Sequence, residues 1–246
     1  MCGRFVSSNS PDQIAACFGA SFETEPLGQN YNVAPTNDVL AIVERAGAPD
    51  EQPVIKAFHW GLVPFWAKDT KVGSKMINAR SETIAEKPVF KKLLASKRIL
   101  IPMDGYYEWQ AIAGQKTKQP MYIHRRDGEP LAAAGLWTTW REKGGGSDAP
   151  WLHSCTIITT AANDTTSSVH DRMLVFLPAT RWHEWLDSSN NDIQALLKLL
   201  VPAPNELLTM HPVSTAVNNV RNKGPELLEP VEPAEPVEPV EGQLPI

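Results

Sequence analysis

The stretch RILIPMDGYYEWQA, residues 98–111, holds two runs of apolar and aromatic residues with the turn residues Asp104 and Gly105 between them. Runs of this kind, bounded by turn residues, are typical of β-strands. We therefore predict strands at 98–102 and 106–111. Similar runs predict further strands at 39–44, 54–60, 121–126, 152–160 and 173–177, and a first strand at 2–6.

Helical periodicity is confined to short segments between these runs. Residues 11–19 are predicted as a helix with Ser10 as N-cap and Gly19 as its end, and residues 88–96 as a helix with Pro88 in its first turn. Two more helices are predicted at 179–186 and 192–200. Because strands outnumber helices and do not alternate with them regularly, the pattern argues against a doubly wound sheet and favours a β-rich α+β domain.

The composition is that of an ordinary globular chain of 246 residues, 42% hydrophobic and 21% charged. The longest apolar stretches, at 99–101 and 131–134, are far shorter than the ~20 residues that cross a bilayer. The N-terminal residues carry no apolar segment of a secretory signal, so we expect a cytoplasmic protein. Three cysteines without a CxxC pair predict free thiols and no metal or other cofactor: Cys2, Cys17 and Cys155.

Acidic residues are concentrated at the C-terminal end. Six of the 28 acidic residues follow Gly224, with no basic residue among them, and the rest of the chain has 23 basic and 22 acidic residues. From Glu229 a Glu-Pro-Val/Ala repeat predicts a disordered tail at 223–246, with a partner-docking or DNA-mimicking arm as the alternative. The glycine-rich segment 143–148 is predicted as a loop within one domain at 1–222, or else as a hinge. A body so close to neutral lacks the field of a general nucleic-acid binder, so any DNA contact must come from a local patch.

Cys2 can become a nucleophile of an unusual kind if Met1 is removed. Residue 2 would then carry a thiol and a free α-amine, whose pKa of about 7.7 to 8.0 leaves roughly a tenth or more of it neutral at pH 7. The amine can condense with an aldehyde to an imine, and the thiol can close a thiazolidine ring. Alternatively, the thiol attacks an acyl carbon with the amine as base. Cys2 can also be simply a small residue in the first strand.

Two later segments hold polar side chains that could act with such a nucleophile. In residues 78–83, Asn78 and Arg80 precede a predicted capping box between Thr83 and Glu86. Glu108 lies among aromatic residues in a predicted strand. If Glu108 faces inward, an apolar setting would raise its pKa toward neutrality and suit it to proton transfer; if it faces outward, it is an ordinary exposed carboxylate.

Another group of candidates follows the polar loop at 163–168. His170 can exchange protons near neutrality and Arg172 can pair with a phosphate, although a single loop histidine can equally be structural. In residues 59–66 we expect Trp60 in the core. We expect Phe65 and Trp66 to be exposed, where they could stack on unpaired bases.

The combination and order of these segments resemble the SRAP family (SOS response-associated peptidase), whose members sense abasic sites in DNA. The resemblance runs from residue 1 to about residue 222, and the segments that carry it are 1–5, 31–36, 60–66, 78–83, 104–109, 160–163 and 170–173. Leu174 departs from the family, which usually has proline there, and the acidic tail lies outside the family domain. The resemblance implies a single β-rich α+β domain with a central barrel-like sheet and peripheral helices.

The resemblance also implies roles for individual residues. Cys2 would form the thiazolidine with the ring-opened sugar, Asn78 would position that terminus, Glu108 would help to open the sugar, and His170 would assist proton transfer in imine formation, strand cleavage and reversal. Phosphates would be held by Arg4, Arg80 and Arg172, and Thr160 would line the pocket. The expected substrate is single-stranded DNA, because a duplex hides the sugar and stacks the bases. We expect a monomer, and the sequence identifies no protein partner.

Other functions remain open on the sequence. Glutamine amidotransferases of the N-terminal nucleophile type also begin Met-Cys-Gly and use the cysteine for acyl transfer. A cysteine-type peptidase that removes Met1 or cuts other peptides is compatible with DNA crosslinking. A non-enzymatic module that only binds damaged single strands is the third alternative.

Overall fold

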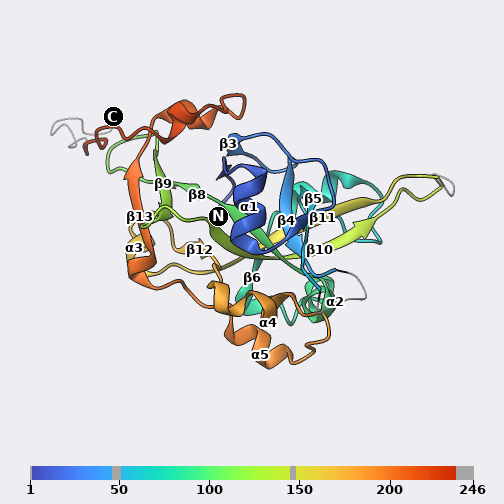
Figure 1. The fold of residues 1–246 in the computed structure, drawn as a ribbon. Helices are drawn as coiled ribbons and strands as arrows, with labels where there is room; N and C mark the ends of the chain where they lie inside the picture. The colour runs from blue at the N-terminus through green and yellow to red at the C-terminus, as the bar shows by residue number, and fades with distance from the viewer. Residues whose placement is uncertain (1, 46–50, 145–147, 237–246) are drawn as a thin grey trace, which may run out of the picture.

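The computed structural model describes residues 2–45, 51–144 and 148–236. Its centre is a closed barrel of five strands (Figure 1). These are β4 (Asp38–Val43), β5 (Val54–Trp60), β7 (Arg98–Met103), β10 (Leu131–Trp140) and β11 (Leu152–Ala161). Four neighbouring pairs are antiparallel, and the ring closes because β11 pairs in parallel with β5, Cys155 opposite Trp60. Short strands extend the sheet outside the ring: β2 (Ser21–Phe22), β6 (Asn78–Arg80) and β12 (Arg172–Leu174).

A second sheet of five strands packs against the barrel. In order across the sheet, these strands are β13 (Leu208–Pro212), β9 (Gln119–Arg125), β8 (Gly105–Gln110), β1 (Phe5–Ser7) and β3 (Asn30–Val33). At one crossing between the two sheets, the single residue Asp104 separates β7 of the barrel from β8 of this sheet. Gly105 is required at this point because a Cβ atom there would lie 2.6 Å from the Ile123 carbonyl oxygen.

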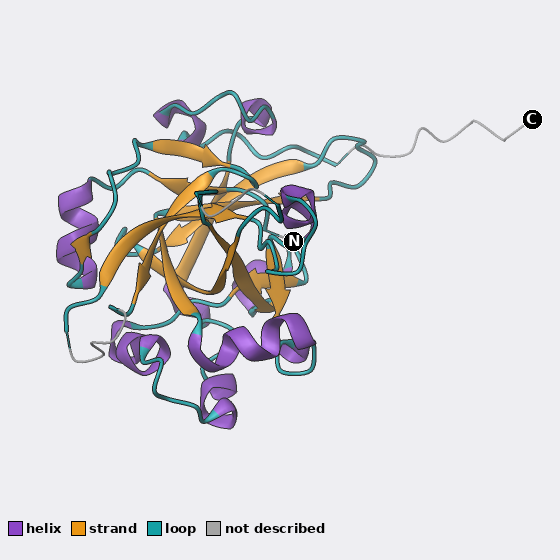
Figure 2. Ribbon diagram, turned by 90° about the vertical axis from the view of Figure 1, so that its right-hand side faces the viewer, coloured by secondary structure: helices purple, strands orange, loops and turns teal. Residues whose placement is uncertain are grey.

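Helices cover the outside of the strands (Figure 2). The α-helices are α1 (Pro11–Phe18), α2 (Pro88–Ser96), α3 (Asp164–Ser167), α4 (Trp182–Leu186) and α5 (Ile193–Lys198). The 3-10 helices are Thr70–Lys75, Ser81–Thr83, Ala179–Arg181, Asn205–Leu207, Thr215–Asn218 and Pro225–Leu228. As predicted, Ser10 caps α1 and Gly19 ends it in a left-handed conformation. None of these helices has the length and apolar character that a membrane span requires.

The alternation of side chains along the strands divides the core in two. Val39, Ala41 and Val43 of β4 join the cluster that fills the barrel and reaches the second sheet, whereas Leu40 and Ile42 pack under the helices. The prediction of a β-rich α+β fold with a barrel-like sheet and peripheral helices is confirmed.

Several local predictions are wrong. Thr83 and Glu86 form no capping box. Helix α2 begins at Pro88, as predicted, which is two residues after Glu86. Lys87 before that proline is extended, with φ −70° and ψ 120°, so no helix continues from Thr83 into α2. The first strand begins at Phe5, so Cys2 lies outside it. The strand predicted at 173–177 ends at Leu174, and the helix predicted at 179–186 begins with a 3-10 turn.

The boundary predicted at residue 223 also differs from the structure. Leu227 is fully buried against the second sheet and against Val213 and Val217. The backbone N–H of Val231 donates to the Pro212 carbonyl oxygen at 3.0 Å. Residues 223–236 therefore pack on the domain. The rest of the predicted tail, 237–246, lies outside the described residues, as do residues 145–147 of the predicted loop at 143–148.

Candidate active site

Cys2 lies in the cluster that fills the barrel, just before strand β1. Its side chain is 1% exposed, and its Sγ donates to the Arg4 carbonyl oxygen at 3.6 Å. Burial raises the pKa of the thiol well above its ordinary value, and the negative charge of Glu108 adds to the rise. Cys2 is thus a protonated thiol in an apolar setting, within range of the charge of Glu108.

Asn78 is the residue that fixes the backbone of Cys2. Strand β6 pairs in parallel with β11, Asn78 opposite Ile157, and this pairing brings the side chain to the start of the chain. The Nδ2 amide donates to the Cys2 carbonyl oxygen at 2.8 Å, while the buried Oδ1 has no hydrogen-bond partner among the residues that the structure describes. The Nδ2 atom of this amide therefore holds Cys2, and the Oδ1 atom can accept a hydrogen bond from another group.

Glu108 faces inward, so the inward alternative for this carboxyl is correct. It is 3% exposed, and burial raises its pKa to about 7; the positive charge of Lys118 lowers this pKa, and the charge of Asp171 raises it by a smaller amount. A carboxyl group with a pKa near neutrality can donate and accept a proton at the same pH. Glu108 has this property next to Cys2.

His170 lies at the edge of the same region, in the loop before β12. The Gln110 side chain at the end of β8 donates to the Ser168 carbonyl oxygen at 3.2 Å and ties this loop to the strand of Glu108. The Arg172 backbone N–H donates to His170 Nδ1 at 3.0 Å, and burial lowers the pKa of the imidazole. Although Nδ1 also lies 2.8 Å from Asp171, the amide is the fixed donor, so we assign the neutral ring with its proton on Nε2.

The three arginines predicted to hold phosphates have different surroundings. The Arg4 guanidinium donates to Asn32 Oδ1 and to the Val217 carbonyl oxygen, both at 2.8 Å. Arg172 forms a two-pronged ion pair with Glu82, at 2.5 and 2.9 Å, and also donates to the Thr159 carbonyl oxygen. Arg80 is exposed on β6, two residues after Asn78.

The aromatic residues near residue 65 divide as predicted. Trp60 is fully buried, and its Nε1 donates to the Ile77 carbonyl oxygen, whereas Phe65 is 69% exposed and Trp66 is 53% exposed. Two hydrogen bonds fix the segment 63–67 to the barrel strands: Ser154 Oγ accepts from the Val63 backbone N–H, and the Trp140 indole donates to the Ala67 carbonyl oxygen.

Thr160 and Leu174 lie on the neighbouring strands β11 and β12. Thr160 is 5% exposed and lies opposite Met173. Leu174 is fully buried in the barrel cluster. The residue that departs from the family pattern thus fills the core.

Three relevant residues were missed by the sequence analysis. Tyr106 shares the inner face of β8 with Glu108, and strand alternation would have placed it there once Glu108 was taken as inward. Lys118 contributes positive charge around both Glu108 and His170. Glu82 pairs with Arg172, a long-range contact that no local pattern indicates.

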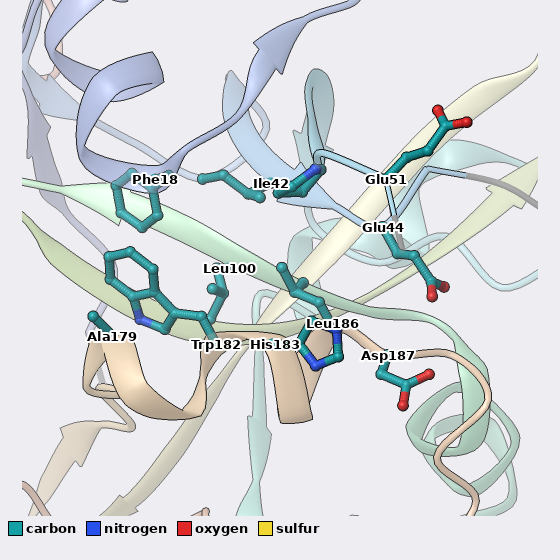
Figure 3. Close-up of a pocket in the computed structure, with 11 residues that line it drawn as sticks. Phe18, Ile42, Glu44, Glu51, Leu100, Ala179, Trp182, His183, Leu186 and Asp187 are labelled. Atoms are coloured by element: carbon teal, nitrogen blue, oxygen red, sulfur yellow. The ribbon is translucent and has the colours of Figure 1, made fainter. Parts of the chain in front are cut away.

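A cavity of about 260 Å³ lies elsewhere, between α1, the ends of β4 and β7, and α4. Phe18 and Trp182 stack on one side of it at 4.5 Å between ring centroids, and three carboxylates border the other: Glu44, Glu51 and Asp187 (Figure 3). None of the predicted site residues lines this cavity. Across the described ranges, no group of three or more His, Cys, Asp or Glu side chains could hold a metal ion.

The fold and the site define a class of protein: a β-barrel domain with a cysteine at position 2, held by an amide beside a near-neutral carboxyl group. The family model "SOS response associated peptidase (SRAP)" matches residues 1–220, and the chain belongs to this family.

Curated relatives and solved structures agree with this assignment. The abasic site processing protein YoqW of Bacillus subtilis is 41% identical over 93% of this chain and 99% of its own length. YedK of Escherichia coli, with the same description, is 34% identical over 94% of this chain and all of its own length. A crystal structure of a Bacteroides thetaiotaomicron protein matches with a TM-score of 0.81 and 25% identity, over 94% of this chain and all of that one.

Proposed function

We propose that this protein senses and processes abasic sites in single-stranded DNA by forming a covalent crosslink through Cys2 after Met1 is removed. The observation that carries the proposal is the buried Cys2 with its carbonyl held by Asn78 and with Glu108, of pKa about 7, beside it. The names of the relatives, which process abasic sites, support the same substrate.

The chemistry follows from the two groups on the processed Cys2. The neutral amine adds to the aldehyde of the opened sugar and releases water, which forms an imine. The thiol then adds across the carbon–nitrogen double bond: a carbon–sulfur bond forms, the π electrons go to nitrogen, and nitrogen gains the proton that sulfur loses. The product is a thiazolidine. Because burial keeps the thiol protonated, the amine is the first nucleophile.

The other buried groups supply the proton transfers. Glu108 opens the sugar ring and shuttles protons, and the neutral His170 takes up and returns a proton through Nε2 in imine formation, strand cleavage and reversal. Asn78 holds Cys2 through Nδ2, and its free Oδ1 can accept a hydrogen bond from the sugar.

DNA would lie across the exposed residues beside the site. Phe65 and Trp66 would stack on unpaired bases, and Arg80 would pair with a phosphate. The guanidinium groups of Arg4 and Arg172 already bind Asn32 and Glu82, and they would keep these partners while also binding phosphates. Thr160 would line the pocket from β11.

The same site would account for associated activities. An imine at the sugar carbon permits elimination of the neighbouring phosphate, which is lyase chemistry, and water attack on the reopened imine reverses the crosslink. Removal of Met1 by the protein itself would be a cysteine-type peptidase reaction. We propose that the protein acts as a monomer, with one oligonucleotide captured per chain.

The test is intact mass spectrometry after mixing the protein with a single-stranded oligonucleotide that carries one abasic site. We expect the mass of the chain without Met1 plus one oligonucleotide minus one water. Cys2→Ala should lose the stable adduct but still bind DNA, and Cys17→Ser, at an exposed cysteine, should crosslink like the wild type.

Two results would refute the proposal. Ammonia release from glutamine without DNA crosslinking would identify an amidotransferase of the N-terminal nucleophile type. Full protection of abasic DNA by Cys2→Ala would identify a binding module without covalent chemistry.

A further inference from the structure

The hydroxyl of Tyr106 is a buried polar group with no protein partner in the described part of the chain. The side chain is fully buried, and its oxygen forms no hydrogen bond. An unpaired buried hydroxyl is costly, and most such groups in folded proteins find a partner. The neighbouring Tyr107 is such a case, since its hydroxyl donates to the Tyr31 carbonyl oxygen at 2.9 Å on the other face of β8.

The strand register places Tyr106 at the active site. Tyr106 and Glu108 point to the same face of β8, because they are two residues apart. Strand β1 is antiparallel to β8 with Phe5 opposite Tyr106, so the chain from Phe5 back to Cys2 runs along β8 in the direction of Glu108. Tyr106 and Cys2 belong to the same buried cluster, and Tyr106 packs against Phe176 with 5.8 Å between ring centroids.

Whereas the Tyr106 hydroxyl lacks an acceptor among the described residues, the sulfur of Cys2 lacks a hydrogen-bond donor once it loses its proton. The Cys2 thiol donates its hydrogen bond to the Arg4 carbonyl oxygen, which is an acceptor, so the contact suits the protonated thiol and not the thiolate. In ring closure the sulfur gives up its proton inside an apolar cluster, where an anion without a donor is unfavourable. Burial raises the pKa of the Tyr106 phenol, and the charges of Cys2 and Glu108 add to the rise, so the hydroxyl stays a donor.

We propose that Tyr106 is a positioning residue whose hydroxyl donates a hydrogen bond to the Cys2 sulfur during closure of the thiazolidine ring. This inference rests on the proposed function. The phenol keeps its proton throughout: the thiol proton passes to the imine nitrogen by way of Glu108, the carbon–sulfur bond forms, and no group is oxidised or reduced. Tyr106 therefore affects the second step, ring closure, and leaves the first step, imine formation, to the amine and Glu108.

The test separates the two steps in single-turnover reactions of Tyr106→Phe with an abasic single-stranded oligonucleotide. Samples are quenched with or without borohydride, which reduces an imine to a stable amine and does not act on the closed ring. In the borohydride-quenched samples we expect the total adduct, reduced imine plus closed ring, to form at the wild-type rate within about twofold. The adduct that survives without borohydride, the closed ring, should form at least about tenfold more slowly.

The matched control is Tyr107→Phe, which removes the hydroxyl from the opposite face of the same strand. It should lower the melting temperature, because Tyr31 loses its partner, and leave the ratio of imine to closed ring unchanged. Tyr106→Phe should melt at the wild-type temperature or higher, since it removes an unpaired group.

The same ratio of the two adducts in Tyr106→Phe and the wild type would overturn the inference while leaving the proposed function in place. If the wild type formed no adduct with either quench, the proposed function itself would be refuted.

Discussion

At the scale of single residues, the site depends on carboxyl groups whose surroundings move their pKa values in opposite directions. Glu108 is buried among apolar groups, and burial raises its pKa from 4.5 to about 7. Glu82 accepts hydrogen bonds from Arg172, which lower the pKa of that carboxyl. The first carboxyl can exchange protons near neutrality, and the second stays charged and holds an arginine in place.

Glu108→Gln should change how stability depends on pH. Between pH 4.5 and 7 the unfolded carboxyl has lost its proton while the folded one keeps it, so the wild type loses stability as pH rises through this window. A shift of this size corresponds to about 3 kcal/mol at most. In urea unfolding, the free energy of unfolding of Glu108→Gln relative to that of the wild type should therefore rise by up to ~3 kcal/mol between pH 4.5 and pH 7.5. Crosslinking by this variant should be slower than by the wild type at neutral pH.

Glu82→Gln is the control with the opposite sign. Its carboxyl has a lowered pKa, so its contribution is present above the unfolded value of 4.5 and is lost as pH falls. This variant should lose stability relative to the wild type at pH 7.5 and recover as pH falls below 4.5. Equal pH slopes for Glu108→Gln and the wild type would show that Glu108 titrates normally and cannot serve as the proton donor.

The identity of the reactive residues could be predicted from the sequence better than their contacts. Cys2, Asn78 and Glu108 carry chemistry that their residue types already indicate, and the structure brings Asn78 to Cys2. The surroundings of Arg172 could not be predicted, because Glu82 is far from it in the sequence and reaches it only through the pairing of β6 and β12 with β11. Whether a charge is free or paired is decided by tertiary contacts.

At the scale of elements, local patterns predict the strands rich in branched side chains and miss a long strand that begins with small ones. Strands β4, β5 and β7 are rich in branched residues and were predicted nearly to the residue. The ten residues of β10 were missed, because they begin Leu-Ala-Ala-Ala-Gly, a composition with low β propensity. The structure requires small residues there: a Cβ atom on Gly135 would lie 2.8 Å from the Thr156 carbonyl oxygen.

The element that presents Phe65 and Trp66 should govern DNA affinity without governing the chemistry. Gly61 and Gly73 touch beneath this segment, since a Cβ atom on Gly73 would lie 2.6 Å from the Gly61 carbonyl oxygen, so the aromatic pair projects from a fixed base. Phe65→Ala and Trp66→Ala should each weaken binding of an undamaged single-stranded oligonucleotide roughly 5- to 150-fold, the range given by 1 to 3 kcal/mol per stacked base. Fluorescence anisotropy measures this change.

Trp151→Ala is the matched control for these two variants. Trp151 is 59% exposed, like the pair, but its ring faces the Arg141 guanidinium at 4.8 Å and lies outside the segment. We expect unchanged affinity for this control, and wild-type crosslinking rates for Phe65→Ala and Trp66→Ala at saturating DNA. Wild-type affinity in both of these variants would exclude the aromatic pair as a base platform.

At the scale of the whole molecule, contacts between distant segments hold the site together. The barrel closes through a parallel pair between β5 and β11, and β6 adds to β11 and brings Asn78 to Cys2. The fold class could be predicted because strand content is local. Local patterns could not predict the pairing of β5 with β11, which joins distant segments, nor the position of the C-terminal segment, since the proline-rich composition after residue 223 is typical of a disordered tail.

That segment should contribute to stability through one side chain. Leu227 is fully buried with Val6, Tyr107 and Val217, and the Val217 carbonyl in turn accepts from Arg4. Leu227→Ala should lower the free energy of unfolding by about 2 to 5 kcal/mol, the usual cost of such a truncation in a core. Val231→Ala, at a residue that is 38% exposed, should stay within about 0.5 kcal/mol of the wild type. Urea unfolding measures both, and equal stability of the two variants would mean that residues 223–236 do not pack on the domain in solution.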